Sequence, residues 1–225
     1  LYLQERIMLV ILLLFLYHVA VLSENVLSKS CCPPPPSLSL QIFGDWVLVW
    51  SVTDHDKGNA LALNVTSSHV EFRLHDDNKM VMFTERTKHQ TCVTYIINMT
   101  MPTDPLDSTL ISFTGAMEKD GLLEVYNETE TFTFFESCPD CLSMVWKDSE
   151  GRFLLNYRRE GHHRDVEKLK ADHSDHHKLA ACLGFPANAN PFNYDGAADF
   201  CHKKSSPKVL RSYFTHVAHH ISRDD

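Results

Sequence analysis

The chain has 225 residues, of which 29 are acidic and 21 are Lys or Arg, and its formal net charge at pH 7 is −8 with histidine neutral. This length fits one β-barrel domain once an N-terminal segment is removed, since such barrels reach about 200–250 residues. Proteins that bind nucleic acid need clustered basic residues to displace counterions from phosphates. Here the Lys and Arg residues are scattered, which argues against nucleic acid as a partner.

The N-terminal region is typical of a secretory signal peptide. Residues 7–22 are almost entirely apolar, but a helix needs about 20 residues to cross a bilayer. A cleavage site before Glu24 makes residues 1–23 the signal, and Met8 is a natural start that leaves residues 1–7 as an upstream extension. Because no later run of about 18 apolar residues follows, we expect a secreted, extracellular protein whose mature chain has no membrane span.

Cysteines and glycosylation sequons agree with this prediction. Disulfides persist in the oxidising compartments of the secretory pathway, and seven cysteines allow three bridges with one thiol left over. These residues are Cys31, Cys32, Cys92, Cys138, Cys141, Cys182 and Cys201. Three N-x-S/T sequons predict a glycoprotein modified at Asn64, Asn98 and Asn127.

Short strands are expected after a Cys- and Pro-rich leader at residues 24–40. From Trp46 onward, runs rich in β-branched and aromatic residues alternate with Asp, Asn, Gly and Pro, which is typical of an antiparallel barrel or sandwich. The strands are predicted near 45–52, 69–75, 80–87, 91–100, 109–114, 121–126, 131–137, 141–147 and 152–158. An eight-stranded barrel needs one strand fewer, so we expect either 109–114 or 121–126 to belong to a long loop or a hairpin extension.

One helix is predicted after the strands. Asp165 caps a stretch in which apolar residues recur every three or four positions up to Leu183, before Gly184 and Pro186 end it. Strands followed by a lone helix exclude a parallel βαβ fold, in which the two types alternate. We expect the helix to pack on the outside of a barrel. Residues 205–225 are either a short amphipathic helix or a segment foreign to the natural protein.

Motifs at both ends of the predicted barrel carry a family resemblance. Residues 43–46 contain the Gly-x-Trp pattern that opens the first strand of lipocalins. Residues 152–158 resemble the last barrel strand of apolipoprotein M, and the sequences around the cysteines at 92, 182 and 201 resemble orosomucoid. The chain is thus similar to the lipocalin family, and especially to the orosomucoid-like plasma proteins that bind toxins and organotins.

The resemblance implies an all-β fold, an eight-stranded antiparallel up-and-down β-barrel with one C-terminal α-helix packed on its outside. This lipocalin domain is expected at residues 41–204. It also implies a stack in which Arg158 covers the indole of Trp46, next to Gly44, at the closed end of the barrel. Such a contact contributes about 0.5–2 kcal/mol and has a structural role.

The resemblance further implies two bridges that tie the termini to the barrel, from Cys92 to Cys201 and from Cys182 to either Cys31 or Cys32. Each closes a loop near 100 residues or longer, which constrains the unfolded chain by about 4–5 kcal/mol. Cys138 lacks its apolipoprotein M partner, and Cys141 is its nearest alternative. A redox Cys-x-x-C motif needs a helix N-terminus to lower the thiol pKa. Strands flank this one, which favours a structural bridge.

Strand alternation predicts the lining of a ligand cavity. If Trp46 points inward, every second residue along the first strand does too. The third strand has two possible registers, beginning at Met80 or at Val81. The first is preferred because counting back from Cys92 matches it to pocket positions in orosomucoid. The predicted ligand-binding residues are Leu48, Trp50, Val52, Val70, Phe72, Leu74, Met80, Met82, Thr84 and Arg86.

The leading hypothesis is an extracellular carrier, not an enzyme, that holds a small hydrophobic or amphiphilic ligand such as a lipid, drug or toxin. The resemblance to apolipoprotein M implies lipoprotein particles as partners, and that to orosomucoid implies cationic amphiphiles. His173 and His177 share a helix face, but solvated histidine-rich faces are common, so no metal and no cofactor is predicted.

Two other functions are considered. The first is a secreted, acute-phase-like glycoprotein that modulates immunity through its surface and glycans. The second is an enzyme similar to prostaglandin-isomerase lipocalins, which need a free thiol inside the barrel. Cys92 is the candidate thiol on the barrel wall, and the family pattern gives it a bridge partner.

Overall fold

The computed structural model describes residues 40–201 except 77–78, 105 and 136–137. The predicted signal peptide, nearly all of the leader and the predicted tail lie outside the described residues. None of the helices in the described part of the chain is long and apolar enough to cross a membrane.

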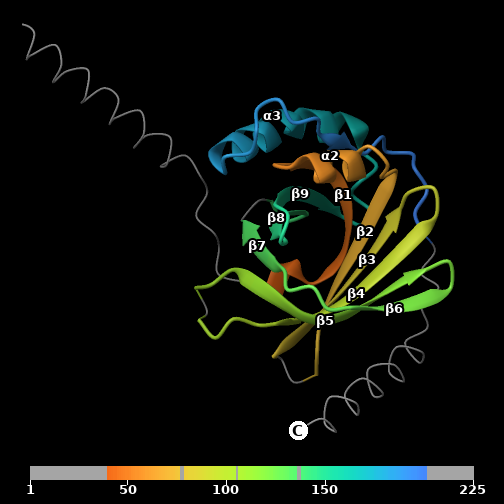
Figure 1. Ribbon diagram of the computed structural model, residues 1–225. Coiled ribbons are helices and arrows are strands. Elements are labelled where there is room, and N and C mark those ends of the chain that lie inside the picture. Colours follow the sequence, from red (N-terminus) through yellow and green to blue (C-terminus); the bar gives the residue numbers. More distant parts are fainter. Residues whose placement is uncertain (1–39, 77–78, 105, 136–137, 202–225) are drawn as a thin grey trace, which may run out of the picture.

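Eight antiparallel strands close into a barrel, as predicted (Figure 1). Around the barrel each strand pairs with the next one in sequence, and β5 is followed by β7 because β6 lies off this path. Strand β1 pairs with β9, which closes the ring. The barrel strands are β1 (Gly44–Thr53), β2 (Ser67–Leu74), β3 (Met80–Lys88), β4 (Cys92–Thr100), β5 (Thr109–Lys119), β7 (Thr131–Phe135), β8 (Cys141–Lys147) and β9 (Arg152–Arg159).

The ninth predicted strand is a hairpin extension. Strand β6 (Leu122–Tyr126) pairs with the second half of β5 and lies off the barrel path. The turn is formed by Asp120 and Gly121, which have φ angles of 53° and 79°. Positive φ at both positions matches the twist of a tight hairpin, which explains the Asp-Gly sequence. Strand β5 is longer than predicted because this hairpin continues it.

Short elements frame the two ends of the barrel. They are the 3-10 helix η1 (Leu40–Ile42), strand β10 (Phe192–Asn193) and helix α2 (Asp56–Ala62). Strand β10 pairs with β1, and α2 follows the end of β1. Helix α2 was not predicted from the sequence, because it has only seven residues and contains a glycine. In Figure 1 it lies beside α3 (Val166–Cys182).

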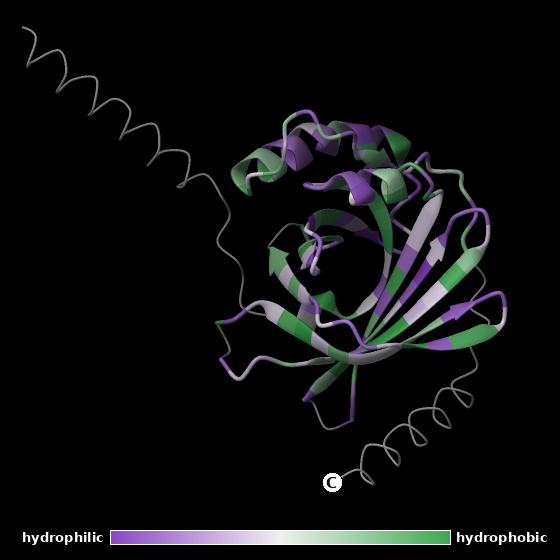
Figure 2. Cartoon of the chain, viewed as in Figure 1, coloured by the Kyte–Doolittle hydropathy of each residue, from purple (hydrophilic) through white to green (hydrophobic). Residues whose placement is uncertain are grey.

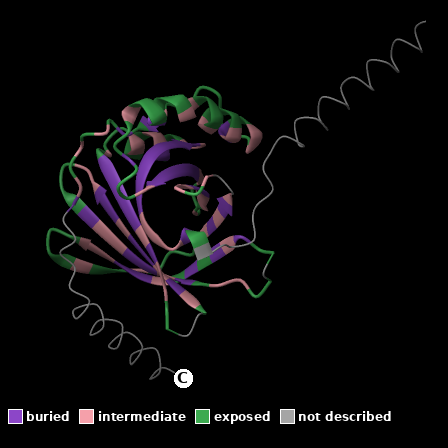
Figure 3. Ribbon diagram, turned by 180° about the vertical axis from the view of Figure 1, so that it is seen from behind, coloured by how far each residue is buried: buried purple, intermediate pink, exposed green. Residues whose placement is uncertain are grey.

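Helix α3 packs on the outside of β1, as predicted. Its first turn is capped by the Asp165 carboxylate, which accepts a hydrogen bond from the backbone N–H of Lys168. Trp50 of β1 lies against the rings of His176 and His177, with centroid distances of 5.3 Å to each. Burial here lowers the pKa of His176 to about 4. Figure 2 shows polar and apolar segments following one another along the helix, and Figure 3 shows most of its surface as exposed or half-buried.

A β-bulge in β1 corrects the prediction for Trp50 and Val52. The register with β9 shifts between Leu48 and Trp50, which leaves Val49 as an extra residue. One extra residue turns every later side chain to the opposite face. Leu48 therefore points into the barrel, whereas Trp50 and Val52 belong to a cluster beneath α3.

The preferred register of the third strand was also wrong. Strand β3 pairs Phe83 with Phe72 and Glu85 with Val70, and cross-strand partners share a face. The inward set is the alternative one that begins at Val81. The residues predicted to line the cavity on β3 face outward, and these are Met80, Met82, Thr84 and Arg86. Arg86 makes an ion pair with Glu71, 3.4 Å between Nη1 and Oε2, on that outer face.

At the closed end of the barrel, the residue over Trp46 is Arg159 rather than Arg158. The guanidinium carbon of Arg159 lies 4.1 Å from the centroid of the indole, because Trp46 pairs directly with Arg159 in the sheet. Arg158, one residue away, points to the other face of β9 and forms a buried ion pair with Asp172 of α3. A Cβ atom on Gly44, which has φ +127°, would lie 2.7 Å from Nη1 of Arg159.

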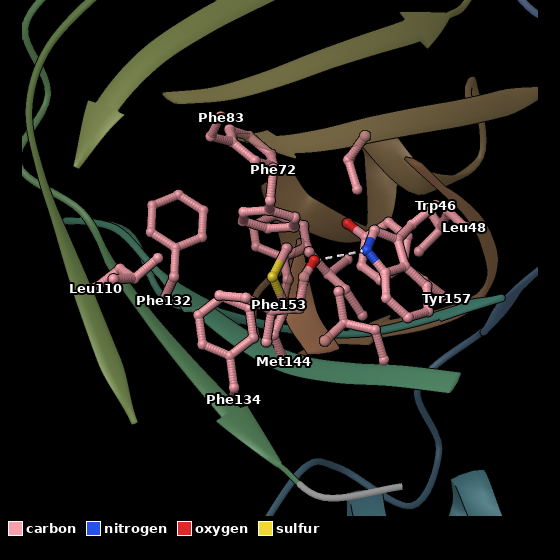
Figure 4. Close-up of a cluster of buried hydrophobic side chains, with 14 of the residues drawn as sticks. Trp46, Leu48, Phe72, Phe83, Leu110, Phe132, Phe134, Met144, Phe153 and Tyr157 are labelled. Carbon is pink, nitrogen blue, oxygen red and sulfur yellow. Dashed lines mark hydrogen bonds between the residues drawn. The ribbon is translucent and has the colours of Figure 1, made fainter. Parts of the chain in front are cut away.

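The lower half of the barrel is filled by side chains. The Trp46 indole is 1% exposed and donates a hydrogen bond of 2.8 Å to the carbonyl of Ile42. Figure 4 shows this bond and the aromatic cluster above it, in which the ring of Phe72 lies 4.9 Å from Phe83 and 5.6 Å from Phe134. The cavity described below lies toward the other end of the barrel.

Two disulfides join described cysteines. Cys92 of β4 is bonded to Cys201, and Cys138 is bonded to Cys141 across the turn before β8. Cys182 at the end of α3 is also disulfide-bonded. Its predicted partners, Cys31 and Cys32, lie outside the described residues.

The contact between Trp46 and Arg159 predicts a measurable coupling. Trp46→Ala should lower the free energy of unfolding by about 3–5 kcal/mol through the cavity it leaves, and Arg159→Ala by about 0.5–2 kcal/mol. Residues in contact deviate from additivity by about 0.5–3 kcal/mol. Urea unfolding of the two single variants and the double variant measures this coupling. The matched cycle with Arg158→Ala, on the other face of β9, should be closer to additive, and equal coupling in both cycles would contradict the stack.

Candidate functional site

A cavity of about 160 Å³ occupies the upper half of the barrel, above the aromatic cluster. Its apolar wall comes from six strands, and the residues are Leu48, Phe83, Ile97, Phe132, Met144 and Leu155. At the mouth, α2 and the segment after it contribute Leu61, Ala62 and Val65. The position of α2 follows from the end of β1, since the chain must turn back over the barrel opening to reach β2.

Aromatic rings form two groups around this cavity. Trp146 of β8 lies between Phe132 and Phe153, nearly parallel to both, with centroid distances of 6.3 Å and 4.8 Å. Tyr95 and Tyr126 meet edge to face at 5.4 Å. Tyr126 reaches the cavity because the β5–β6 hairpin folds back beside the barrel. Such rings offer flat apolar surfaces whose faces carry partial negative charge.

Glu130 places a carboxyl group in this apolar wall. It stands just before β7 and is 1% exposed. Its backbone N–H donates to the hydroxyl of Ser112, and its Oε1 accepts a short hydrogen bond from the hydroxyl of Tyr126. No hydrogen-bond partner for Oε2 exists among the described residues. The backbone contact fixes where the carboxyl group enters the cavity.

Burial raises the pKa of Glu130 to about 7, because desolvation disfavours the charged carboxylate. The Tyr126 hydroxyl lowers this pKa and the nearby charge of Glu85 raises it. The indole of Trp146 also lowers it, although its N–H makes no hydrogen bond of ordinary geometry within the described part of the chain. Burial likewise raises the pKa of Tyr126, so that hydroxyl remains a hydrogen-bond donor.

Glu85 is the second acidic residue of the cavity. Its Oε1 accepts hydrogen bonds of 2.8 Å from the hydroxyls of Ser68 and Thr87. Ser68 and Thr87 are paired neighbours on β2 and β3, which holds the carboxylate in place from two strands. Ser51 and His89 complete the polar lining. The site therefore combines apolar and aromatic walls with two positioned carboxyl groups.

Of the ten predicted ligand-binding residues, Leu48 lines this cavity. Val70 and Phe72 point inward as predicted but are buried in the packed core, and Leu74 packs against its edge. Among the predicted glycosylation sites, Asn64 and Asn127 are exposed and Asn98 on β4 is half-buried.

Sequence reasoning missed the two glutamates and the tyrosines. Glu85 belongs to the rejected register of β3, so choosing that register would have found it. Glu130 and Tyr126 flank a run of polar residues that is typical of a surface loop. This pattern does not indicate that either side chain is buried.

One group of potential metal ligands occurs in the described residues, on the outside of the barrel. Ligand atoms of Asp45, His69 and Glu160 lie within 4.8 Å of one another. Asp45 also makes an ion pair with Arg73, 2.6 Å between Oδ2 and Nη2. This contact competes for the carboxylate, and the group is separate from the cavity.

Comparisons with known proteins point to binding proteins. No protein-family model matches the chain. It is 45% identical over 170 residues to saxitoxin and tetrodotoxin-binding protein 1 of Takifugu pardalis, and 44% identical to protein 2 of the same fish. The matches cover 75% of this chain and 42% of each relative, so the chain spans less than half the length of these relatives.

A solved structure supports the fold. The siderocalin Ex-FABP, described as functioning through dual ligand specificities, superposes with a TM-score of 0.51 at 11% sequence identity. The superposition covers 71% of this chain and 97% of that protein. At this identity the likeness bears on the fold alone, and that fold is the barrel described above.

The raised pKa of Glu130 predicts a pH-dependent stability difference. Its folded-state pKa of about 7 lies above the ordinary 4.5, so the folded protein binds more protons than the unfolded chain between these values. The wild type therefore loses stability as the pH rises through this window. Glu130→Gln removes this loss, and its melting temperature relative to wild type should be higher at pH 8 than at pH 4.

Differential scanning calorimetry of both proteins at the two pH values checks this expectation. Glu128→Gln is the matched control, because Glu128 is exposed two residues away and is not among the residues that line the cavity. A pH-independent difference for Glu130→Gln would show that this carboxyl group titrates normally.

Proposed function

The chain is a lipocalin by fold and a homologue of the saxitoxin and tetrodotoxin-binding proteins over three quarters of its length, and from this premise we propose that it is an extracellular carrier. It would hold one small hydrophobic or amphiphilic molecule inside the barrel. The single observation that carries this proposal is the cavity at the upper end of the barrel.

The architecture suits binding because the barrel is packed at one end and hollow at the other. Closure of an eight-stranded sheet leaves an interior that holds side chains or one small ligand. Here Trp46, Phe72 and Phe134 fill the lower half. Above them, Phe83 and Met144 are among the side chains that line the cavity. Predominantly apolar walls with a few placed polar groups are typical of small-molecule sites.

The size of the cavity limits what it can enclose. A dry cavity of about 150 Å³ in another protein accommodates benzene, so about 160 Å³ is enough for one ring or a short branched chain. A larger ligand would extend past Ala62 and Val65 toward the mouth. A lipid with long acyl chains fits this space less well than a compact molecule.

The chemistry of the cysteines favours a carrier over a thiol-dependent isomerase. Isomerisation of that kind needs a free thiol in the barrel, but Cys92 is bonded to Cys201. Cys92 also lies on the face of β4 opposite to Tyr95 and Ile97, since side chains alternate along a strand. Its disulfides further support the proposed secretion, because such bonds persist in oxidising compartments.

A fluorescence titration of the full chain, secreted from cultured cells, tests the proposal. We expect a neutral apolar naphthylamine dye to bind with a stoichiometry of one. Ala62→Trp places a large ring at the mouth and should weaken dye binding by about tenfold or more, since overfilling a packed site costs about 1–3 kcal/mol. Ala60→Trp is the matched control on the exposed side of α2 and should bind the dye as wild type does.

Absence of saturable dye binding to the folded wild type would refute carriage in this cavity. Equal weakening by both tryptophan substitutions would show that the dye binds elsewhere near α2.

A further inference from the structure

The disulfide between Cys138 and Cys141 differs from the other bridge that joins two described cysteines. It links residues three positions apart, whereas Cys92 and Cys201 are 109 positions apart. In the chain-entropy model a bridge stabilises the fold more when it closes a longer loop, so the short bridge contributes less. Both of its cysteines are half-buried, and Pro139 between them is exposed. The fold therefore depends little on this bridge for holding distant parts of the chain together.

Other contacts hold the turn that carries the short bridge. The backbone N–H of Cys141 donates to the carbonyl of Cys138 at 2.9 Å, and the carbonyl of Asp140 accepts a hydrogen bond of 3.0 Å from the N–H of Arg159. The Asp140 carboxylate also pairs with Arg159, 3.7 Å between Oδ1 and Nε. These contacts do not involve the sulfur atoms, so the backbone of the turn can keep its place when the bridge opens.

A buried guanidinium lies against one sulfur of the bridge. Arg158 is 4% exposed, and its Nη1 donates to Sγ of Cys138 at 3.0 Å. Arg158 stands directly opposite Cys141 in the ladder between β8 and β9, which holds it beside the turn. Its Nη2 pairs with Asp172 of α3. Since a guanidinium keeps its charge in proteins, a permanent positive charge lies next to Cys138.

This contact changes what the Cys-x-x-C motif can do. A positive group next to a cysteine stabilises its thiolate, and a neighbouring arginine serves this purpose as a helix N-terminus does. The contact was not predicted, because the family resemblance places Arg158 over Trp46. When a disulfide opens, the sulfur with the more stable thiolate leaves faster. Cys138 is therefore the better leaving group of the two, and Cys141 is the sulfur that an incoming thiolate attacks.

We propose that the Cys138–Cys141 bridge is a thiol–disulfide exchange site for small thiols, in which Arg158 stabilises the Cys138 thiolate as it departs. The thiolate of a small monothiol attacks Sγ of Cys141, the bond between the two Sγ atoms breaks, and Cys138 keeps the electron pair. The product is a mixed disulfide on Cys141. This site is separate from the cavity and does not depend on the proposed carrier function.

A second small thiol completes the exchange. Its thiolate attacks the sulfur that the first thiol added, which releases a small disulfide and leaves Cys141 as a thiolate that takes a proton from water. One protein disulfide is reduced and two small thiols are oxidised to one disulfide, so the bridge gains two electrons and two protons. The reverse sequence closes the bridge again when the small disulfide is in excess.

The charged groups around the bridge make a prediction about sign. Asp172 of α3 shares the guanidinium of Arg158, and Asp140 in the turn pairs with Arg159. Burial lowers the pKa of His176 on α3 to about 4, so this histidine is neutral near pH 7. Arg158 is thus the cation next to the sulfur, and Asp172 opposes its effect. Removal of one charge should slow the exchange, and removal of the other should speed it.

Peptide mapping of the full chain, secreted from cultured cells, compares the two bridges in one molecule. The protein is exposed to glutathione at pH 7, samples are quenched with acid, and free thiols are alkylated. We expect Cys138–Cys141 to open about tenfold or more faster than Cys92–Cys201, because it closes the shorter loop and has the better leaving group. The first adduct should be glutathione on Cys141. Equal opening rates, or a first adduct mainly on Cys138, would overturn the proposal.

Variants separate the charge of Arg158 from its packing. Arg158→Met should slow the opening by about threefold or more, because the departing thiolate loses its cation. Asp172→Asn should speed the opening, because the guanidinium is no longer shared. The matched control is Arg164→Met, which removes an exposed arginine and should leave the rate unchanged. Loosening of α3 alone would shift the rates of the first two variants in the same direction, and that result would contradict the role of Arg158.

A free thiol keeps the test decisive if Arg158→Met fails to fold. In Cys141→Ala the Cys138 thiol has lost its bridge partner, and its rate of alkylation by iodoacetamide follows the fraction of thiolate. The guanidinium of Arg158 should hold the pKa of this thiol below the ordinary value of about 8.5. The pH profile of alkylation should therefore have its midpoint below that value. A midpoint at the ordinary value or above it would refute stabilisation of the thiolate by Arg158.

Discussion

The structure depends on how strand β1 closes the barrel. It pairs with β9 along almost its whole length, but with β2 only over Gly44–Val47. Beyond that point β2 diverges, and the free side of β1 pairs with β10 at Trp50 and Ser51. The lower half of β1 is thus held between two barrel strands, where Trp46 is buried. Its upper half borders an opening, and the cavity lies at this end.

The β1 bulge gives one strand two tasks. Below it, inward side chains fill the core, and above it Trp50 and Val52 turn outward to seat α3 while Ser51 faces the cavity. A large indole at position 50 would otherwise occupy ligand space. The closed end likewise depends on which face of the strand a side chain points to. Arg159 contacts Trp46, whereas its neighbour in sequence, Arg158, points to the opposite face and contacts α3.

Much of the fold could be predicted, because local residue patterns indicate the strand ends, the Asp120–Gly121 turn and the Asp165 cap. The cavity lining could not, because side-chain direction depends on a parity that one bulge or one register choice reverses. Val49 carries no local mark of a bulge, and both registers of β3 offered plausible apolar residues. The burial of Glu130 could not be predicted for another reason. Its burial arises from a hairpin that folds back beside the barrel, which is a long-range property that no pattern around residue 130 contains.

That hairpin has a consequence for solubility. Strand β6 is paired on one side only within the described part of the chain, and Leu122 and Val125 are 69% and 59% exposed. An open strand edge with apolar side chains is a template for aggregation, and charged residues placed on it counter this tendency. Glu124 is the exposed charge in the middle of β6. Its electrostatic repulsion opposes edge-to-edge association of two copies, so the side chain protects colloidal stability from a position that has no contact with the cavity.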